Sequence, residues 1–264
     1  MKSCLLATLL IGFVTAPTQT LPSSAPDTTE RKAVLDDARE NALNLEHSLP
    51  DFVCIQTTRR FQRVKGRTWQ PIDVIVERLT YFDHCERYKV LTMNGQPSKI
   101  AHQQLGGASS SGEFGSLMKE IFLPETEAEF EWQDSLMLRG RMMQVYTYRV
   151  RAFRSKYHIE LPDRSLDLVA AYHGLVFIAG ESHLVYRITL DFDGIPQTFP
   201  IQDLEISLDY DHTRIGEVDY LVPFEFELSS RRGNSSVKNH VEFGNYQKFH
   251  ADSLIRFDSE DARE

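Results

Sequence analysis

The chain has 264 residues, of which 38 are Asp or Glu and 29 are Lys or Arg, so its net charge at pH 7 is −9. This acidic balance argues against a nucleic-acid-binding protein and against attachment to anionic lipid surfaces, because both attract clustered Lys and Arg. The length allows one domain with a well-buried core, and no linker that would separate two domains is evident.

The first 20 residues have the features of a secretory signal peptide. Lys2 precedes an uncharged, mainly apolar run from Cys4 to Val14, which is too short to span a bilayer. We therefore expect residues 1–20 to be a signal peptide and residues 21–27 a flexible leader. The mature protein is then periplasmic or secreted, with no membrane span.

An amphipathic helix is predicted from residue 28 to Ser48. Asp27 and Glu30 stand at the spacing of a capping box, and apolar residues recur every three or four positions until Pro50 ends the helix.

Three consecutive antiparallel strands are predicted after this helix. They cover residues 52–64, 72–82 and 85–92, and Asn94-Gly95 is a strong hairpin signal at the end of the third. In the second strand the alternation places Ile72, Val74 and Val76 on the apolar face, opposite Asp73 and Glu77.

The segment from Gln103 to Gly115 is rich in Gly and Ser and is predicted to be a flexible loop that could act as a lid. Ser110 and Glu113 have capping-box spacing, so a short amphipathic helix is expected to begin there and to end at Pro124.

From residue 136 onward the sequence alternates apolar and polar residues with a period of two, up to a last strand over residues 254–257. In residues 203–211, Leu204, Ile206, Leu208 and Tyr210 share one face, and the acidic residues between them are expected to face solvent.

The predicted fold is mainly β, with about nine to eleven strands in one curled antiparallel sheet, an open half-barrel around one long and one or two short helices. Residues 28–258 would form this single domain and residues 259–264 a tail. A filled sandwich of two sheets is the alternative.

The predicted sheet carries more large apolar side chains on one face than so few helices can cover. These side chains are expected to line a concave ligand-binding cavity, and the residues are Tyr146, Tyr148, Phe177, Tyr186, Phe192, Phe224 and Phe226.

Cys54 and Cys85 remain after removal of a signal peptide, and in an oxidising compartment they could form a disulfide. The alternative is two unpaired cysteines buried as small apolar side chains.

The sequence contains no motif that specifies catalysis, and no metal or cofactor is predicted. Gly180-Glu181-Ser182-His183 lacks the second glycine of a nucleophile elbow and lies in a predicted hairpin. His173 is interpreted as a structural histidine within a strand, and Glu113 as a capping residue.

The order of elements resembles that of the LolA/LolB-like carriers and of the N-terminal domain of RseB-type periplasmic regulators. Residues 48–230 also resemble an uncharacterised family of bacterial secreted proteins. The segments that carry this second likeness are Leu49-Pro50-Asp51-Phe52-Val53-Cys54, Thr57-Thr58-Arg59-Arg60, Ser111-Gly112-Glu113-Phe114-Gly115 and Tyr172-His173-Gly174. The resemblance implies an open β half-barrel around helices, with a hydrophobic cavity for acyl chains.

The leading hypothesis is an exported, non-enzymatic binding protein of the bacterial cell envelope. Its concave sheet face would hold a hydrophobic ligand or a lipidated partner such as a lipoprotein. One alternative is an envelope protein–protein interaction module whose core is filled by its own helices. Another is a hydrolase that uses His173 or Glu113.

Overall fold

The computed structural model describes residues 27–106, 112–161 and 166–249. Two α-helices, α1 (Thr28–Ser48) and α2 (Ser116–Phe122), are accompanied by the short 3-10 helices η1 (His102–Gln104) and η2 (Pro124–Thr126). The strands are β1 (Phe52–Val64), β2 (Gln70–Phe82), β3 (Cys85–Met93), β4 (Gln96–Pro97), β5 (Glu129–Leu138), β6 (Arg141–Val150), β7 (His158–Leu161), β8 (Leu166–Val169), β9 (Ala171–Ala179), β10 (Val185–Asp193), β11 (Asp203–Ile215), β12 (Val218–Arg232) and β13 (Ser235–Lys248).

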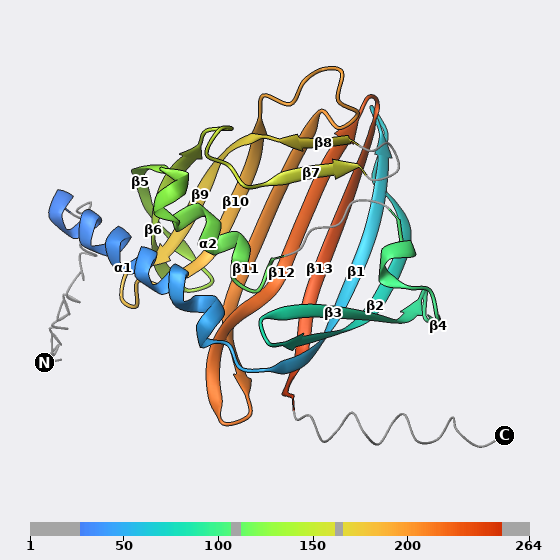
Figure 1. Ribbon diagram of the computed structural model, residues 1–264, viewed down its shortest axis with the longest axis horizontal. Helices are drawn as coiled ribbons and strands as arrows, with labels where there is room; N and C mark the ends of the chain where they lie inside the picture. Colours follow the sequence, from blue (N-terminus) through green and yellow to red (C-terminus); the bar gives the residue numbers. More distant parts are fainter. Residues whose placement is uncertain (1–26, 107–111, 162–165, 250–264) are drawn as a thin grey trace, which may run out of the picture.

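Eleven of the described strands form one antiparallel sheet in the order β4-β3-β2-β1-β13-β12-β11-β10-β9-β6-β5. The sheet curls around α1 and α2 without closing, because β4 and β5 remain as its two edges (Figure 1). β7 and β8 form a separate two-stranded sheet. The predicted mainly β half-barrel is confirmed. The strand predicted over residues 254–257, the signal peptide and the tail lie outside the described residues.

Helix α1 forms as its sequence predicts. The Asp27 side chain accepts a hydrogen bond from the backbone N–H of Glu30 at 2.8 Å, and the helix buries a stripe of Val34, Ala38, Ala42 and Leu45. This stripe contacts the face of the sheet that carries Tyr146, Tyr172 and Tyr210, which we call the concave face.

Helix α2 begins later than the capping-box spacing predicts. Its N-cap residue is Gly115, which has no side chain to cap the helix, and the helix starts at Ser116. The interpretation of Glu113 as a capping residue is therefore wrong. Glu113 is instead buried, with 4 % of its surface exposed.

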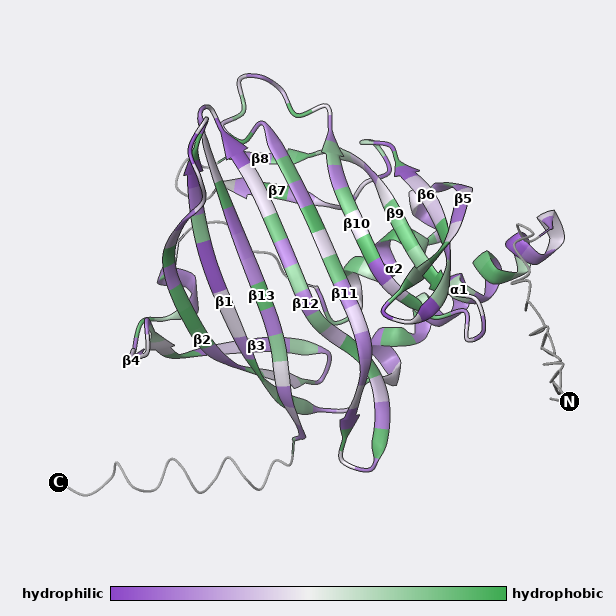
Figure 2. Cartoon of the chain, turned by 180° about the vertical axis from the view of Figure 1, so that it is seen from behind, coloured by the Kyte–Doolittle hydropathy of each residue, from purple (hydrophilic) through white to green (hydrophobic). Residues whose placement is uncertain are grey.

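The long strands alternate hydrophobic and hydrophilic residues (Figure 2). In β11, Leu204, Ile206, Leu208 and Tyr210 are all buried, as predicted. Asp209, however, is buried on the other face, where the guanidinium groups of Arg187 and Arg139 approach its carboxylate to 2.9 Å and 3.2 Å. The expected solvent exposure of this acid is wrong because two cations from neighbouring segments enclose it.

The two cysteines are free, Cys54 buried and Cys85 exposed. Cys54 in β1 pairs with Leu79 of β2, and Cys85 in β3 pairs with Phe82 of β2. Strand β2 thus lies between them, and strands two apart are separated by roughly 9–10 Å, beyond the reach of a disulfide. The prediction of a disulfide is wrong. The alternative is correct that both cysteines are unpaired and that Cys54 is buried, but Cys85 is exposed.

No helix among the described residues combines the length and apolar character needed to cross a membrane.

Candidate functional site

The concave face has an apolar part and a polar part. Over β5, β6 and β9–β12 it carries mainly apolar side chains, covered by α1 and α2, whereas over β1–β3 polar and acidic side chains occur among them. Two tyrosines tie the helices to the apolar part. The Tyr146 hydroxyl donates a hydrogen bond to the carbonyl oxygen of Arg31 in α1, and the Tyr172 hydroxyl donates one to the carboxylate of Glu120 in α2.

Four of the predicted cavity residues lie on the concave face. Tyr146 and Tyr148 belong to β6, and Phe192 belongs to β10, where its ring packs 5.8 Å from Tyr172. Phe226 pairs in register with Leu208. All four contact the closed core rather than an open space.

The other three predicted cavity residues lie elsewhere. Phe177 pairs with Arg187 on the outer face, and the Arg187 guanidinium lies 5.6 Å above its ring. Phe224 similarly lies under Arg139, at 4.6 Å. Tyr186 occupies a β-bulge of β10, where its hydroxyl contacts the His212 ring nitrogen at 3.0 Å. The seven residues therefore do not share one surface, and their role in ligand binding stays a prediction.

A short segment, residues 112–115, enters the centre of the concave face. Its Phe114 ring lies 5.2 Å from Phe52, 5.9 Å from Tyr81 and 5.4 Å from Phe243. The Tyr210 hydroxyl donates a buried hydrogen bond of 3.0 Å to the carbonyl oxygen of Glu113. This segment is part of one that carries the sequence likeness described above, and the structure places it at the meeting point of the apolar and polar parts.

Two glycines make this entry possible. Gly112 and Gly115 have φ angles of +93° and +122°, which residues with a Cβ rarely adopt. A Cβ on Gly115 would also lie only 3.1–3.2 Å from the backbone nitrogen, Cα and Cβ of Glu46 in α1. Glycine at this position lets the start of α2 pack directly against α1.

The polar part contains three acidic residues that we call the acidic cluster, Glu77, Glu86 and Glu113. Glu77 is 2 % exposed, and its carboxylate contacts the His102 ring nitrogen at 2.8 Å. Glu86 is half-buried and accepts a hydrogen bond of 2.5 Å from the Tyr88 hydroxyl. The Tyr88 ring in turn stacks on His102 at 4.4 Å.

Burial and hydrogen bonds shift the pKa values of Glu86 and of groups around the acidic cluster. Burial raises the pKa of the Glu86 carboxyl, while the Tyr88 hydroxyl and the backbone N–H groups of Gly112 and Phe114 oppose the shift. The hydrogen bond to Glu77 raises the pKa of His102. Burial, followed by the charges of Glu113 and Glu86, raises the pKa of both Tyr88 and Tyr210.

The raised pKa values predict how stability depends on pH. A group whose pKa is higher in the folded than in the unfolded state binds more protons when folded, so the free energy of unfolding falls as pH rises through its folded pKa. For Glu86 this loss begins above the ordinary value of 4.5, and for His102 above 6.5. Both groups therefore make the protein less stable on the alkaline side.

The variant Glu86→Gln should lose part of this dependence. Because its amide is never charged, we expect E86Q to exceed the wild type at pH 8 by on the order of 1 kcal/mol in free energy of unfolding and to lack that advantage near pH 4. Urea unfolding at several pH values measures the difference. Glu217→Gln, in an exposed turn, is the matched control. An E86Q curve parallel to that of the wild type would contradict the prediction.

The sequence interpretation missed Glu77 of the acidic cluster because it assigned the buried face of β2 to the wrong set of alternate residues. Ile75, Glu77, Leu79 and Tyr81 are the buried positions, whereas Ile72 and Val74 are 44 % and 37 % exposed. The predicted apolar face of this strand is therefore wrong. A one-residue shift transfers every side chain to the other face, so Glu77 points inward rather than to solvent.

The histidines and serine considered for catalysis lie apart from the acidic cluster. His173 contacts Asp193 at 2.9 Å, and His183, beside Ser182, contacts Asp37 of α1 at 2.7 Å. Each of these histidines joins two segments through an ion pair or hydrogen bond. Neither interaction provides a nucleophile activated by a base.

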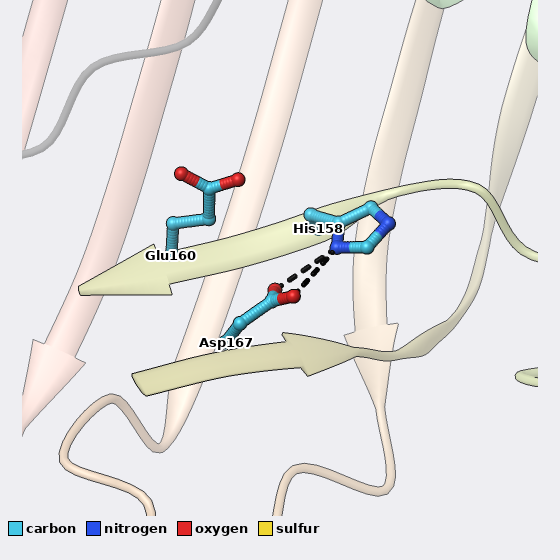
Figure 3. A group of neighbouring side chains, drawn as sticks. All are labelled: His158, Glu160 and Asp167. Carbon is cyan, nitrogen blue, oxygen red and sulfur yellow. Dashed lines mark hydrogen bonds and ion pairs between the residues drawn. The ribbon is translucent and has the colours of Figure 1, made fainter. Parts of the chain in front are cut away.

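One group of metal-type side chains occurs in the described residues, on the β7–β8 ribbon (Figure 3). His158 Nδ1 lies 3.0 Å from both carboxylate oxygens of Asp167, and Glu160 is the cross-strand neighbour of Asp167. All three side chains are exposed. The His158–Asp167 contact satisfies both partners without an ion, so we assign no metal to this group.

No family model matches the chain, and no curated protein matches it. Solved structures do match. A LolA superfamily protein from Nitrosomonas europaea is 8 % identical with a TM-score of 0.35, and the match covers 84 % of this chain and 96 % of that one. A DUF1329 family protein from Desulfovibrio piger is 8 % identical with a TM-score of 0.37, covering 83 % and 93 %. The lipoprotein LppX from Mycobacterium tuberculosis is 12 % identical with a TM-score of 0.28, covering 83 % and 97 %.

The predicted likeness to LolA-type proteins is confirmed as a likeness to such structures.

Proposed function

We propose that the chain is an exported, non-enzymatic binding protein of the bacterial cell envelope that holds a hydrophobic ligand, or the lipid of a lipidated partner, in its concave face. The observation that supports this proposal is the position of α2. This helix of seven residues sits on the apolar part of the concave face, and its buried side chains are Leu117, Met118, Ile121 and Phe122.

Helix α2 has the properties expected of a segment that an apolar ligand displaces from the concave face. A helix this short is not stable without packing, so its position depends on the four buried side chains and a few polar contacts. The polar contacts include an ion pair of 3.1 Å between Lys119 and Glu46 and the hydrogen bond from Tyr172 to Glu120. An acyl chain in the same place would bury a similar apolar surface and replace most of the free energy lost when α2 leaves.

The test is a direct search for such a ligand. Protein purified from the expressing cells is extracted with organic solvent and analysed for lipid, and a fluorescent acyl probe is titrated onto the extracted protein. We expect saturable binding, and stronger binding to Phe122→Ala, because the smaller side chain leaves room where the ring stacks on Phe130.

Met142→Ala, at a residue that is 50 % exposed, serves as the control and should bind the probe like the wild type. If neither the wild type nor F122A carries lipid or binds the probe saturably, the hydrophobic ligand is refuted.

A specific observation favours the second candidate, an interaction module of the cell envelope with a filled core. The described side chains of the concave apolar part are already packed together, with Tyr148, Tyr172 and Phe122 each at most 2 % exposed. This candidate predicts that affinity purification recovers a protein partner in stoichiometric amount and no lipid. The same preparations used for lipid extraction distinguish the two candidates.

A further inference from the structure

The two hairpin turns at one end of the sheet enclose a pocket of about 470 Å³. One turn joins β1 to β2 and the other joins β12 to β13, and both lie at the upper right of Figure 1. The backbone N–H of Lys65 donates a hydrogen bond of 2.8 Å to the carbonyl oxygen of Asn234, which fixes the turns against each other. The pocket is lined by Arg63, Lys65, Gly66, Arg67, Arg231, Gly233, Asn234 and Ser236.

This pocket is basic in a chain whose net charge is −9. Four of its lining residues are cationic and none is acidic. Within the described residues, no ion pair with a carboxylate involves Arg63, Lys65 or Arg67, whereas arginines such as Arg59, Arg60 and Arg187 each form one. Three cations held close together without a counter-charge attract an anion.

The fourth cation is held in place by its neighbours. The Asp203 carboxylate accepts a hydrogen bond from Arg231 Nε, and the side-chain oxygen of Gln202 accepts one of 2.7 Å from Nη1. Arg63 is also positioned, because its guanidinium lies 4.5 Å above the Trp69 ring. The pocket thus presents at least two arginines with restrained orientations, which limits the entropy lost on binding.

The glycines keep the floor of the pocket open. Gly66 and Gly233 have φ angles of +78° and +59°, as their turns require. Apart from the glycine and its chain neighbours, no atom lies within 4 Å of the place where either Cβ would be, so the backbone of both turns is accessible to a ligand.

We propose that this pocket binds a phosphate group. Arginine binds phosphate through paired N–H donors and lysine adds a compact charge, so the combination suits a phosphate better than a carboxylate or a neutral ligand. The volume exceeds that of a bare phosphate ion and accommodates the group attached to it. The phosphate can belong to a soluble phosphate ester or to a phospholipid headgroup.

The experiment uses the purified protein and defined probes. Inorganic phosphate and glycerol 3-phosphate are titrated while Trp fluorescence is recorded, and vesicles of phosphatidylcholine with or without phosphatidylglycerol are tested by co-flotation at low salt. We expect binding of glycerol 3-phosphate, of phosphatidylglycerol vesicles, or of both, and these results identify the source as soluble, lipid or either.

Arg63→Gln with Arg67→Gln should weaken that binding at least about tenfold. Ser236→Asp, which adds an acid to the lining and removes no cation, should do the same. Arg87→Gln with Arg214→Gln removes the same charge at two exposed residues away from both turns and should change affinity less than about twofold. Circular dichroism verifies that each variant is folded.

The proposal is overturned if no phosphate probe binds the wild type, or if the R87Q/R214Q pair weakens binding as much as the R63Q/R67Q pair. It does not depend on the apolar part of the concave face. If the wild type binds a phosphate probe but does not bind the acyl probe, the proposed function is refuted and the phosphate site is not.

Discussion

Replacing Gly174 by Ala should separate β9 from β10 locally and lower the free energy of unfolding by more than about 3 kcal/mol. A Cβ at residue 174 would lie 1.8 Å from the carbonyl oxygen of Thr189 and 3.1 Å from the Tyr148 ring. Neither neighbour can yield easily, because the first is strand backbone and the second is a buried ring.

The reason for this close approach is an irregularity in the ladder. The regular pairs Ile188 with Val176 and Asp191 with His173 leave Gly174 opposite a stretch without regular pairing. There the Thr189 carbonyl accepts a hydrogen bond of 2.8 Å from the Tyr148 hydroxyl, and the Thr189 hydroxyl accepts one of 3.0 Å from the Leu175 backbone N–H. Side-chain groups thus replace ladder bonds, and the added methyl group would disrupt all of them.

Urea unfolding followed by fluorescence measures this effect. Gly180→Ala is the matched control, since the nearest atom to its Cβ would be 3.7 Å away and its backbone needs no positive φ. We expect G180A to change stability by less than about 0.5 kcal/mol. A G174A protein within about 1 kcal/mol of the wild type would show that β9 and β10 can separate at little cost.

Phe114→Ala should lower the free energy of unfolding by about 3–5 kcal/mol. The ring is 1 % exposed and contacts aromatic side chains of β1, β2 and β13, so its removal leaves a cavity between strands distant in the sequence. The loss also weakens the hold on residues 112–115, whose polar contacts to the sheet include the hydrogen bond from the Tyr210 hydroxyl and the approach of backbone N–H groups to Glu86.

Thermal and urea unfolding of F114A test this expectation, with Phe153→Ala as the control at a phenylalanine that is 74 % exposed. F153A should match the wild type. If F114A is no less stable than F153A, residues 112–115 do not depend on the aromatic centre. Titration of F114A with the acyl probe measures access to the concave face separately from stability. We expect the loosened residues 112–115 to admit the probe more readily.

Much of the fold could be predicted because strand alternation is a local property. In β11, apolar side chains at every second position match the buried face, and α1 has both a capping residue and an apolar stripe. Local alternation fails where both faces carry apolar residues. The apolar residues of β2 continue across both faces, and only its pairing with β1 determines that Ile75 and not Val74 is buried.

The candidate site could be predicted only in part because its residues meet through long-range pairing. Glu113 could be recognised in the sequence by its spacing from Ser110, but that spacing predicted a helix cap. Glu77 and Glu86 lie on neighbouring strands, and only the curl of the sheet brings them close to residues 112–115. A buried acid resembles a solvated one in the sequence, as Asp209 also demonstrates.

The position of β1 beside β13 has a consequence for the order of folding. These strands are the first and last of the described sheet in chain order, yet they pair along almost their whole length in its interior. This part of the sheet therefore forms only after nearly the entire chain has been synthesised, and such distant pairing makes folding slow. Until then β1, β2 and β3 are not joined to the strands from β12 to β5. The β1–β13 pair is therefore expected to form after the two parts of the sheet that it joins.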